Sequence, residues 1–229
     1  MIDYRNFRLS KLNTAEYSHL KYLFFWPIYG IVFMLLERFA HFDYTYMHCS
    51  LDDFIPFCEY FIVPYLFWFI FVTGMLFYGL FFDTKTFVYY MKLIILTCSA
   101  ACIMYVIYPS AQNLRPVVFE RHNAFTRIIQ MFYKFDTNTN VCPSVHVTAS
   151  MAVTISAWNS KYFRKWYFRL AFVFTASIIS ISTLFTKQHS VIDVICAILV
   201  VGTAWLANAI YSDIKSAKTS SDKKSIFMR

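Results

Sequence analysis

The feature of this sequence that most limits its fold is a series of long, nearly uninterrupted apolar segments. Hydrophobic residues make up 59% of the 229 residues and aromatic residues 21%, with only 4 glycines. A water-soluble domain of this length does not need so much apolar surface, whereas a helix that crosses a bilayer needs about 20 apolar residues. Because a lipid-exposed backbone must satisfy its own hydrogen bonds, we predict an all-α, polytopic membrane protein.

The apolar segments predict six transmembrane helices in one bundle and a single membrane domain over residues 1–229. We expect a retained cytoplasmic tail at residues 1–21, a six-helix core at 22–211 and a basic, disordered cytoplasmic tail at 212–229. The expected spans run from about Tyr22 to Ala40, Cys58 to Phe82, Phe87 to Tyr108, Pro143 to Trp158, Trp166 to Phe185 and Ser190 to Tyr211.

The distribution of basic residues predicts the orientation. Six spans put both termini on one side of the membrane, together with most of the 21 Lys and Arg residues. The other side holds only Arg38, Arg115, Arg121, Arg127, Lys134 and Lys187. Because Lys- and Arg-rich loops stay cytoplasmic, we expect both termini in the cytoplasm of a cell-membrane protein. The net charge of +8 suits an anionic lipid surface, and no nucleic-acid-binding pattern accompanies it.

This orientation brings three polar clusters to the extracytoplasmic end of the bundle. The first follows the third span and includes Arg115, and the second is Cys142-Pro143-Ser144-Val145-His146. The third, His189 with Asp193, opens the sixth span. Clusters that are distant in sequence and meet at one depth indicate a site.

His189 and Asp193 stand four residues apart, so they share one face of a helix. A carboxylate there accepts the proton of one ring nitrogen and leaves the lone pair of the other free to attack or to bind a metal. A structural bond between two helices is the alternative. Together with His146, which is placed to protonate a leaving alkoxide, the pair suits nucleophilic attack on phosphorus.

Three further residues suit a phosphate group. The starts of the fourth and sixth helices offer unpaired N–H groups and positive dipole ends, which attract anions. The Ser144 hydroxyl can donate to a phosphate oxygen, Arg115 offers a planar fork, and Lys187 offers a point charge beside His189. We therefore predict Arg115, Ser144 and Lys187 as substrate-binding residues.

Pro143-Ser144-Val145-His146, His189-Ser190-Val191-Ile192-Asp193 and the upstream Arg115-Pro116 together resemble the type 2 phosphatidic acid phosphatase superfamily. By motif, the resemblance extends over roughly Tyr108 to Ile210. It implies a lipid phosphatase or phosphotransferase that needs no metal or cofactor and works through a phosphohistidine. His189 would be the nucleophile, Asp193 its orienting carboxylate and His146 the general acid, with Arg115 and Ser144 as phosphate ligands.

The sequence departs from the family's motifs at three positions. Tyr108 stands where the first motif begins with Lys, Val145 replaces a Gly, and Thr183 stands where the third motif has Arg. Two phosphate-binding cations are therefore missing, and Lys187 is predicted to replace one. The pattern is more similar to the branch related to inositol phosphorylceramide and sphingomyelin synthases, which move a phospho-headgroup between lipids. Phosphotransfer is thus the alternative to hydrolysis of a lipid phosphate.

Two hypotheses from other classes are open. His146, His189 and Asp193 could form a metal site of two histidines and one carboxylate. A non-enzymatic transporter could use the His189–Asp193 pair as a proton relay, but it should have broken helices near the bilayer middle. The last three predicted helices offer only Gly202 for such a break. A catalytically inactive scaffold is a further variant.

Residues outside these clusters are interpreted without a catalytic or substrate-binding role. The segment Asn123–Phe135 is interpreted as an amphipathic loop on the bilayer rather than an interfacial helix. Asp52, Asp53 and Glu59 are expected to be solvated or to pair with basic residues. A disulfide among Cys49, Cys58 and Cys142 is allowed by their positions but not assigned. The identity of the lipid and the oligomeric state do not follow from the sequence.

Overall fold

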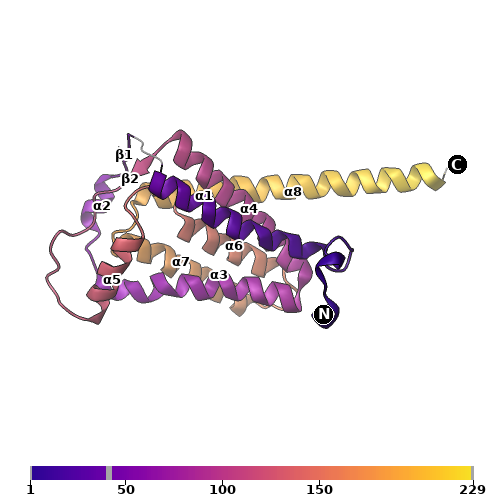
Figure 1. The fold of residues 1–229 in the computed structure, drawn as a ribbon, viewed down its shortest axis with the longest axis horizontal. Coiled ribbons are helices and arrows are strands. Elements are labelled where there is room, and N and C mark those ends of the chain that lie inside the picture. The colour runs from indigo at the N-terminus through magenta and orange to yellow at the C-terminus, as the bar shows by residue number, and fades with distance from the viewer. Residues whose placement is uncertain (1, 40–42, 228–229) are drawn as a thin grey trace.

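The computed structural model describes residues 2–39 and 43–227 and is almost entirely helical. Its long helices run side by side along the longest axis, with the N-terminus and the end of α8 toward the same end (Figure 1). They are α1 (Phe25–Phe39), α3 (Ile62–Phe82), α4 (Thr84–Ile107), α6 (Val145–Asn159), α7 (Trp166–Phe185) and α8 (Val191–Phe227).

Short elements gather at the opposite end of the bundle, where α2 (Ser50–Phe54) and α5 (Ala124–Phe135) lie (Figure 1). There β1 (Thr45–Tyr46) and β2 (Ser110–Ala111) form a parallel pair, with Thr45 beside Ser110 and Tyr46 beside Ala111. This pair joins the connection after α1 to the end of α4. Short 3-10 helices occupy Tyr4–Asn6, Leu9–Lys11, Ser18–Phe24 and Glu59–Phe61.

Five helical segments are long and apolar enough to cross a membrane, so the chain is a multi-pass membrane protein. These segments agree closely with five of the six expected spans, although Ala40 lies outside the described residues. They are Ser18–Arg38, Glu59–Phe82, Thr84–Ile107, Trp166–Phe185 and Val191–Tyr211. The remaining expected span corresponds to α6, which has only 15 residues.

The short helix α6 forms the centre of the bundle, in contact with α3, α4, α7 and α8. Most of its buried residues are small (Ala149, Ser150, Ala152, Thr154, Ser156 and Ala157), so neighbouring helices can approach its backbone closely. The hydroxyl of Thr154 donates to the backbone carbonyl of Ser150 at 3.0 Å. Because four helices surround α6, the residues at its start lie in the interior of the bundle.

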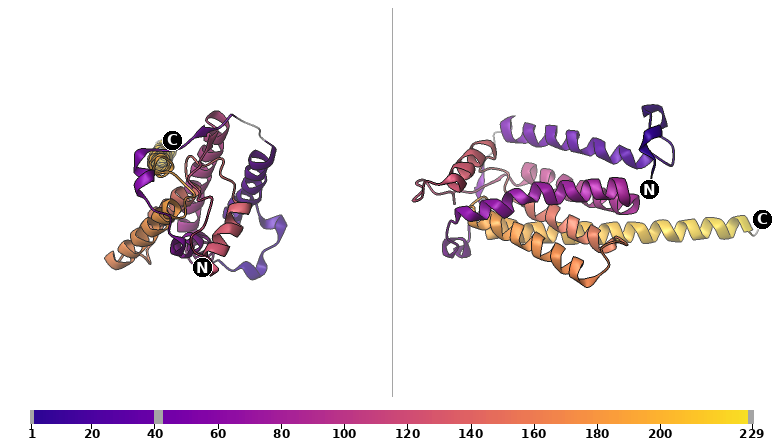
Figure 2. Two further views of the ribbon diagram at one scale, coloured as in Figure 1. Left: turned by 90° about the vertical axis from the view of Figure 1, so that its left-hand side faces the viewer. Right: turned by 90° about the horizontal axis from the view of Figure 1, so that it is seen from below.

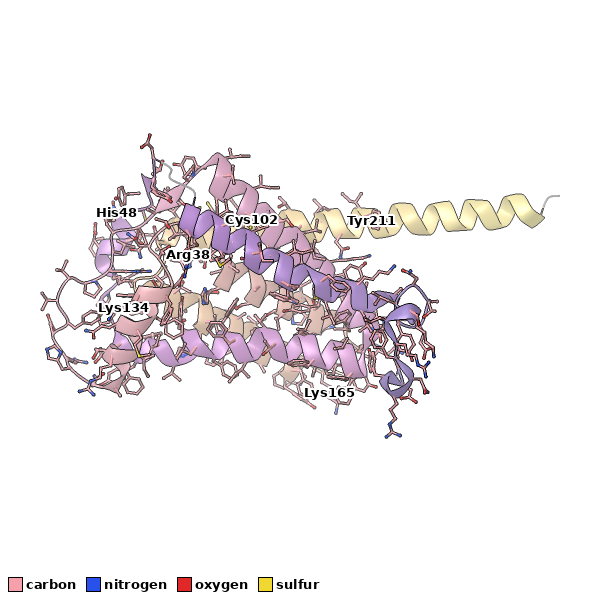
Figure 3. The ribbon with its side chains drawn as sticks, in the orientation of Figure 1. Arg38, His48, Cys102, Lys134, Lys165 and Tyr211 are labelled. Carbon is pink, nitrogen blue, oxygen red and sulfur yellow. The ribbon has the colours of Figure 1, made fainter. Side chains whose placement is uncertain are left out.

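Charged side chains mark the two ends of the bundle. His48 and Lys134 lie toward the end that carries α2 and α5, whereas Lys165 lies toward the other end (Figure 3). Between these ends α3 and α7 expose large apolar side chains such as Phe67, Ile70 and Phe174. This arrangement fits an apolar belt between two polar surfaces.

Two expectations about local structure differ from the fold. Residues 124–135, interpreted as a loop, form the helix α5, because Asn123 and Thr126 make reciprocal capping bonds that start it. Residues 212–227, expected to be disordered, continue α8 beyond the bundle (Figure 2). No glycine or proline follows Gly202 to end that helix. All six cysteines are free, so no disulfide joins Cys49, Cys58 or Cys142.

The turn between α3 and α4 contains a single residue, Asp83, and is held by side chains from three elements. The Asp83 carboxylate accepts from the Thr86 hydroxyl at 2.9 Å and from the Ser160 hydroxyl at 3.1 Å. The Tyr78 hydroxyl is 2.7 Å from the same Ser160 oxygen. This network fixes the end of α6 to the α3–α4 hairpin.

Gly79 allows the close approach in this hairpin and provides a test of the fold. A Cβ at Gly79 would lie 2.8 Å from Phe87 Cα, whereas one at Gly74 would have no atom within 4 Å. We expect Gly79→Ala to lower the free energy of unfolding in detergent by about 1–3 kcal/mol through overpacking. The matched variant Gly74→Ala should be neutral or stabilising by up to about 1 kcal/mol. Equal melting temperatures for the two variants would contradict this packing.

Candidate active site

A cavity of about 300 Å³ lies where α1, α3, α4 and α5 surround the start of α6. Its wall is mostly aromatic, and both His146 and His189 line it. The two rings come from different elements, because His146 is in the first turn of α6 and His189 lies two residues before the start of α8. Their centroids are 6.2 Å apart. The fold therefore brings together two histidines that are 43 positions apart in the sequence.

His189 is oriented by the first turn of α8. Its Nδ1 lies 3.3 Å from Oδ2 of Asp193, which is fully buried. The same carboxylate oxygen accepts the backbone N–H of Ser190 at 2.9 Å. An ionised carboxylate can only accept, so this pairing suits the tautomer in which Nδ1 donates to Asp193 and Nε2 keeps its lone pair. The spacing of four residues thus produces the predicted pairing.

His146 is held between aromatic rings of α3. Its ring centroid is 4.3 Å from that of Tyr65 and 4.4 Å from that of Trp68. Its Nε2 is buried and has no hydrogen-bond partner among the described residues. A polar atom fixed in this way, beside a cavity that holds a second imidazole, is available to a bound ligand.

Five more buried polar atoms near the histidines lack a partner in the described chain: Trp68 Nε1, Arg115 Nε, Asn140 Oδ1, Ser144 Oγ and Asp193 Oδ1. Ser144 is the N-cap of α6, and its backbone N–H donates to the carbonyl of Asp193 at 3.3 Å. Buried polar groups normally find a hydrogen-bond partner, so this cluster indicates that a polar ligand completes the site.

Arg115 lies beside the site, but its guanidinium mainly binds the protein itself. It donates to the backbone carbonyls of Tyr133, Asp136 and Thr137 and to the side-chain oxygen of Gln188. The guanidinium also lies over the Tyr133 ring, 4.4 Å from its centroid. Burial lowers the pKa of Arg115, and the nearby Asp136 carboxylate opposes this shift. Arg115 therefore fastens the segment after α5 to the turn that carries His189.

Lys187 is directed away from the histidines and does not line their cavity. Its ammonium group donates to the backbone carbonyls of Asp52 and Ile55 in the α2 segment. Burial lowers the pKa of Lys187, while the carboxylates of Asp52 and Asp53 oppose the shift. The phosphate-binding role predicted for Lys187 is not favoured by this geometry.

Asp52, expected to be solvated or paired with a base, instead supports the His189 turn. It is 2% exposed, and its carboxylate accepts from the Ser190 hydroxyl at 2.6 Å and from the Val191 N–H at 2.9 Å. Burial favours a higher pKa for Asp52, but these bonds and one from Cys49 together hold it below the ordinary value. Only the tertiary contact between α2 and α8 reveals this role.

The two positions at which the family's cations are missing contribute no other charge. Tyr108 is exposed at the end of α4, and Thr183 is buried with its hydroxyl bonded to the Ser180 carbonyl at 2.7 Å. No group of three His, Cys, Asp or Glu side chains within the described part of the chain is arranged to hold a metal ion.

Residues 89–216, more than half of the chain, match the PAP2 superfamily. The chain belongs to the PAP2 superfamily. Neither a curated protein nor a solved structure matches it. PAP2 membership implies phosphatase- or phosphotransferase-type activity on lipid phosphates, and the matched range contains His146, His189 and Asp193.

The match confirms the family predicted from the motifs, but it does not support assignment to the inositol phosphorylceramide synthase-like branch. That branch stays a prediction. The matched range begins within α4, so α1, α2 and α3, including Asp52, lie outside it.

Replacing Asp52 tests its support of the His189 turn. Asp52→Asn should lower turnover and lower the free energy of unfolding by about 2–4 kcal/mol, because a buried, charge-assisted network loses its acceptor. Asp53→Asn is the control, since Asp53 is exposed and bonded only to His48 among the described contacts. Kinetics and thermal unfolding in detergent measure both effects.

The lowered pKa of Asp52 also predicts how its contribution to stability changes with pH. Because the pKa of Asp52 is lowered in the folded state, its contribution is complete above its unfolded pKa and is lost as pH falls through the folded value. Asp52→Asn should therefore lose less stability on acidification than the native chain. An Asp52→Asn variant with native turnover and native melting would show that the network does not support the site.

Lys187→Met distinguishes support of the α2 segment from phosphate binding. We expect a lower melting temperature and an unchanged KM, because the lost bonds are those to the carbonyls of Asp52 and Ile55. Lys134→Met, at an exposed position near the same end, is the control (Figure 3). A raised KM with unchanged melting would restore the phosphate-binding role.

Proposed function

We propose that the chain is a metal-independent enzyme that cleaves a lipid phosphate ester through a phosphohistidine on His189. The single observation that carries this proposal is the pair of imidazoles, with ring centroids 6.2 Å apart on one cavity, one of them held by Asp193. At this separation both rings can reach substituents of one phosphorus atom. The aromatic wall of the cavity suits the adjoining part of a lipid.

The proposed reaction has two displacements. His189 Nε2 attacks phosphorus, the phosphorus–oxygen ester bond breaks, and protonated His146 gives its proton to the leaving alkoxide. Water then loses a proton to His146 and attacks phosphorus, which breaks the phosphorus–nitrogen bond and frees His189. Asp193 stabilises the charge that develops on the His189 ring in the first step. Ser144 and the N–H groups at the start of α6 would bind the phosphate oxygens.

We further propose six membrane crossings, with α6 as the shortest and the site at the extracytoplasmic end. Two observations support this topology. The N-terminus and the end of α8 lie toward the same end of the bundle (Figure 1), and most Lys and Arg residues fall in the segments at that end. A cell-membrane protein with both termini in the cytoplasm would then receive its lipid in the outer leaflet.

A phosphotransferase is the second candidate, and a specific observation favours it. Neither Arg115 nor Lys187 lines the cavity, whereas the carboxylate of Asp136 does. A phosphodiester carries less negative charge than a phosphomonoester, so such a site suits a phospholipid headgroup better than a terminal phosphate. An alcohol would then replace water in the second displacement and receive the phosphoryl group from His189.

Histidine variants test the central assignment. His189→Ala should abolish turnover, and His146→Ala should lower the rate by about 10²–10⁴-fold because the leaving group loses its acid. His122→Ala is the matched control, since His122 lies in the exposed segment before α5. The assay is a panel of lipids with purified protein, scored separately for free phosphate and for headgroup-bearing product, with and without an alcohol acceptor.

Near-native turnover of His189→Ala on any lipid that the native protein cleaves would exclude the phosphohistidine mechanism. The rival metal site is tested by the same assay in chelator. Turnover should persist there, and the loss of turnover, restored by a divalent metal, would instead support His146, His189 and Asp193 as ligands. A reaction with labelled lipid, quenched in alkaline denaturant, should leave an alkali-stable, acid-labile label on the native chain and none on His189→Ala.

A further inference from the structure

One wall of the cavity is formed by the segment that follows α5. Asp136, Thr137, Thr139 and Asn140 line the cavity together with both histidines. Arg115 holds this segment from behind through its bonds to the backbone carbonyls of Asp136 and Thr137. Among the described residues, no lysine or arginine lines the cavity. The wall therefore presents Asp136 to the cavity, while the nearby guanidinium of Arg115 lies outside the cavity lining and is bonded to backbone carbonyls and Gln188.

Asp136 is connected to each imidazole through one intervening residue. Its Oδ2 accepts the hydroxyl of Tyr65 at 2.9 Å and the side-chain amide of Gln188 at 3.3 Å. Tyr65 stacks on His146, and Gln188 precedes His189. A carboxylate has about four acceptor positions, so these two bonds leave acceptor capacity unused. A group bound beside the reacting phosphorus is thus within reach of this wall.

Asn140 adds a second, independent indication of a ligand. It is 4% exposed, lines the cavity, and has a side-chain oxygen with no partner among the described residues. Its amide nitrogen donates to Glu37 at 3.4 Å, which fixes the oxygen as the unpaired atom. An acceptor buried without a partner costs free energy unless a ligand donates to it.

Of the donors on the same side, Trp68 Nε1 has no partner among the described residues, whereas three hydroxyls are already used inside the protein. The hydroxyl of Tyr65 binds Asp136, that of Tyr105 binds the Pro143 carbonyl at 2.9 Å, and that of Thr137 binds Glu37 at 2.7 Å. Acceptors therefore exceed donors on this wall. A second phosphate would meet a carboxylate and few available donors, whereas hydroxyl or N–H groups would meet two acceptors.

We propose that Asp136 and Asn140 form a headgroup subsite, and that it selects a phospholipid headgroup with hydrogen-bond donors over one with a second phosphate. This inference rests on the proposed function, because it assigns the group attached to the phosphorus that His189 attacks. Hydroxyl headgroups and primary ammonium headgroups share the required chemistry. A diphosphate or a phosphorylated headgroup does not.

The test compares lipids with identical acyl chains in mixed micelles with the full-length protein. Phosphatidylglycerol supplies hydroxyl donors, phosphatidylethanolamine an N–H-bearing ammonium, and phosphatidylcholine an ammonium without N–H. Diacylglycerol diphosphate supplies a second phosphate, and phosphatidic acid has no headgroup. We expect kcat/KM for the first two lipids to exceed that for the diphosphate by about 10–100-fold. Phosphatidylcholine should be cleaved more slowly than phosphatidylethanolamine.

Two variants assign this preference to the wall. Asp136→Asn should lower the preference for donor headgroups over the diphosphate by about tenfold or more, because the like charge is removed. Asn140→Gly should raise KM for the donor headgroups more than KM for phosphatidic acid. Glycine suits the backbone there, since Asn140 has a φ of 54°. Asp53→Asn, outside the cavity, should change neither ratio.

The outcomes separate this inference from the function on which it rests. Turnover that depends on His189 but favours the diphosphate in the native protein would overturn the subsite alone. Equal rates for phosphatidylcholine and phosphatidylethanolamine would overturn the requirement for a donor. If Asp136→Asn fails to fold, two measurements still test the subsite. They are the effect of Asn140→Gly on the donor headgroups relative to phosphatidic acid, and the lipid panel with the native protein. Loss of all dependence on His189 would instead overturn the proposed function.

Discussion

The site depends on one buried carboxylate that belongs to a different part of the chain from the histidines. Asp52 accepts from the Ser190 hydroxyl and the Val191 N–H, so it adds to the cap that the start of α8 makes from its own sequence, in which Ser190 Oγ accepts the Ile192 N–H at 3.2 Å. Lys187 completes the junction by binding carbonyls of the α2 segment. His189 lies between these two attachments. Its ring can hold one direction toward the cavity only because the backbone on both sides is fixed.

The bundle supplies the second requirement, a rigid polar end on an apolar body. Van der Waals packing of small residues on α6 sets the depth of His146, and rings from α3 fix its orientation. Gln112, fully buried, joins the region after β2 to the His189 turn by donating to the Lys187 carbonyl at 3.0 Å. Polar networks are expensive to bury unless nearly every group is paired. The unpaired atoms around His146 and Ser144 are therefore concentrated where a ligand would bind.

Features that depend on local periodicity and on topology could be predicted from the sequence. Apolar runs located the long helices, and the four-residue spacing located the His189–Asp193 pair. Counting spans placed His146 at the same end of the bundle. The directions of long side chains could not be predicted from periodicity or topology. Arg115 and Lys187 stand beside the motifs in sequence, yet both bind backbone carbonyls, because unpaired carbonyls in irregular segments attract buried cations. Asp52 was missed for the same reason, since its partners are 138 and 139 positions away.

The departures from the family's motifs reduce the positive charge around the candidate site. Tyr108 and Thr183 remove two cations, and the two basic residues left nearby are occupied by backbone carbonyls. The electrostatic attraction for phosphate then comes mainly from helix starts, which offer partial charges rather than full ones. A site of this kind binds a singly charged phosphodiester with little loss, but it stabilises a dianion or a diphosphate less well. Asp136 also lines the cavity, so both features are consistent with the proposed preference for a singly charged substrate.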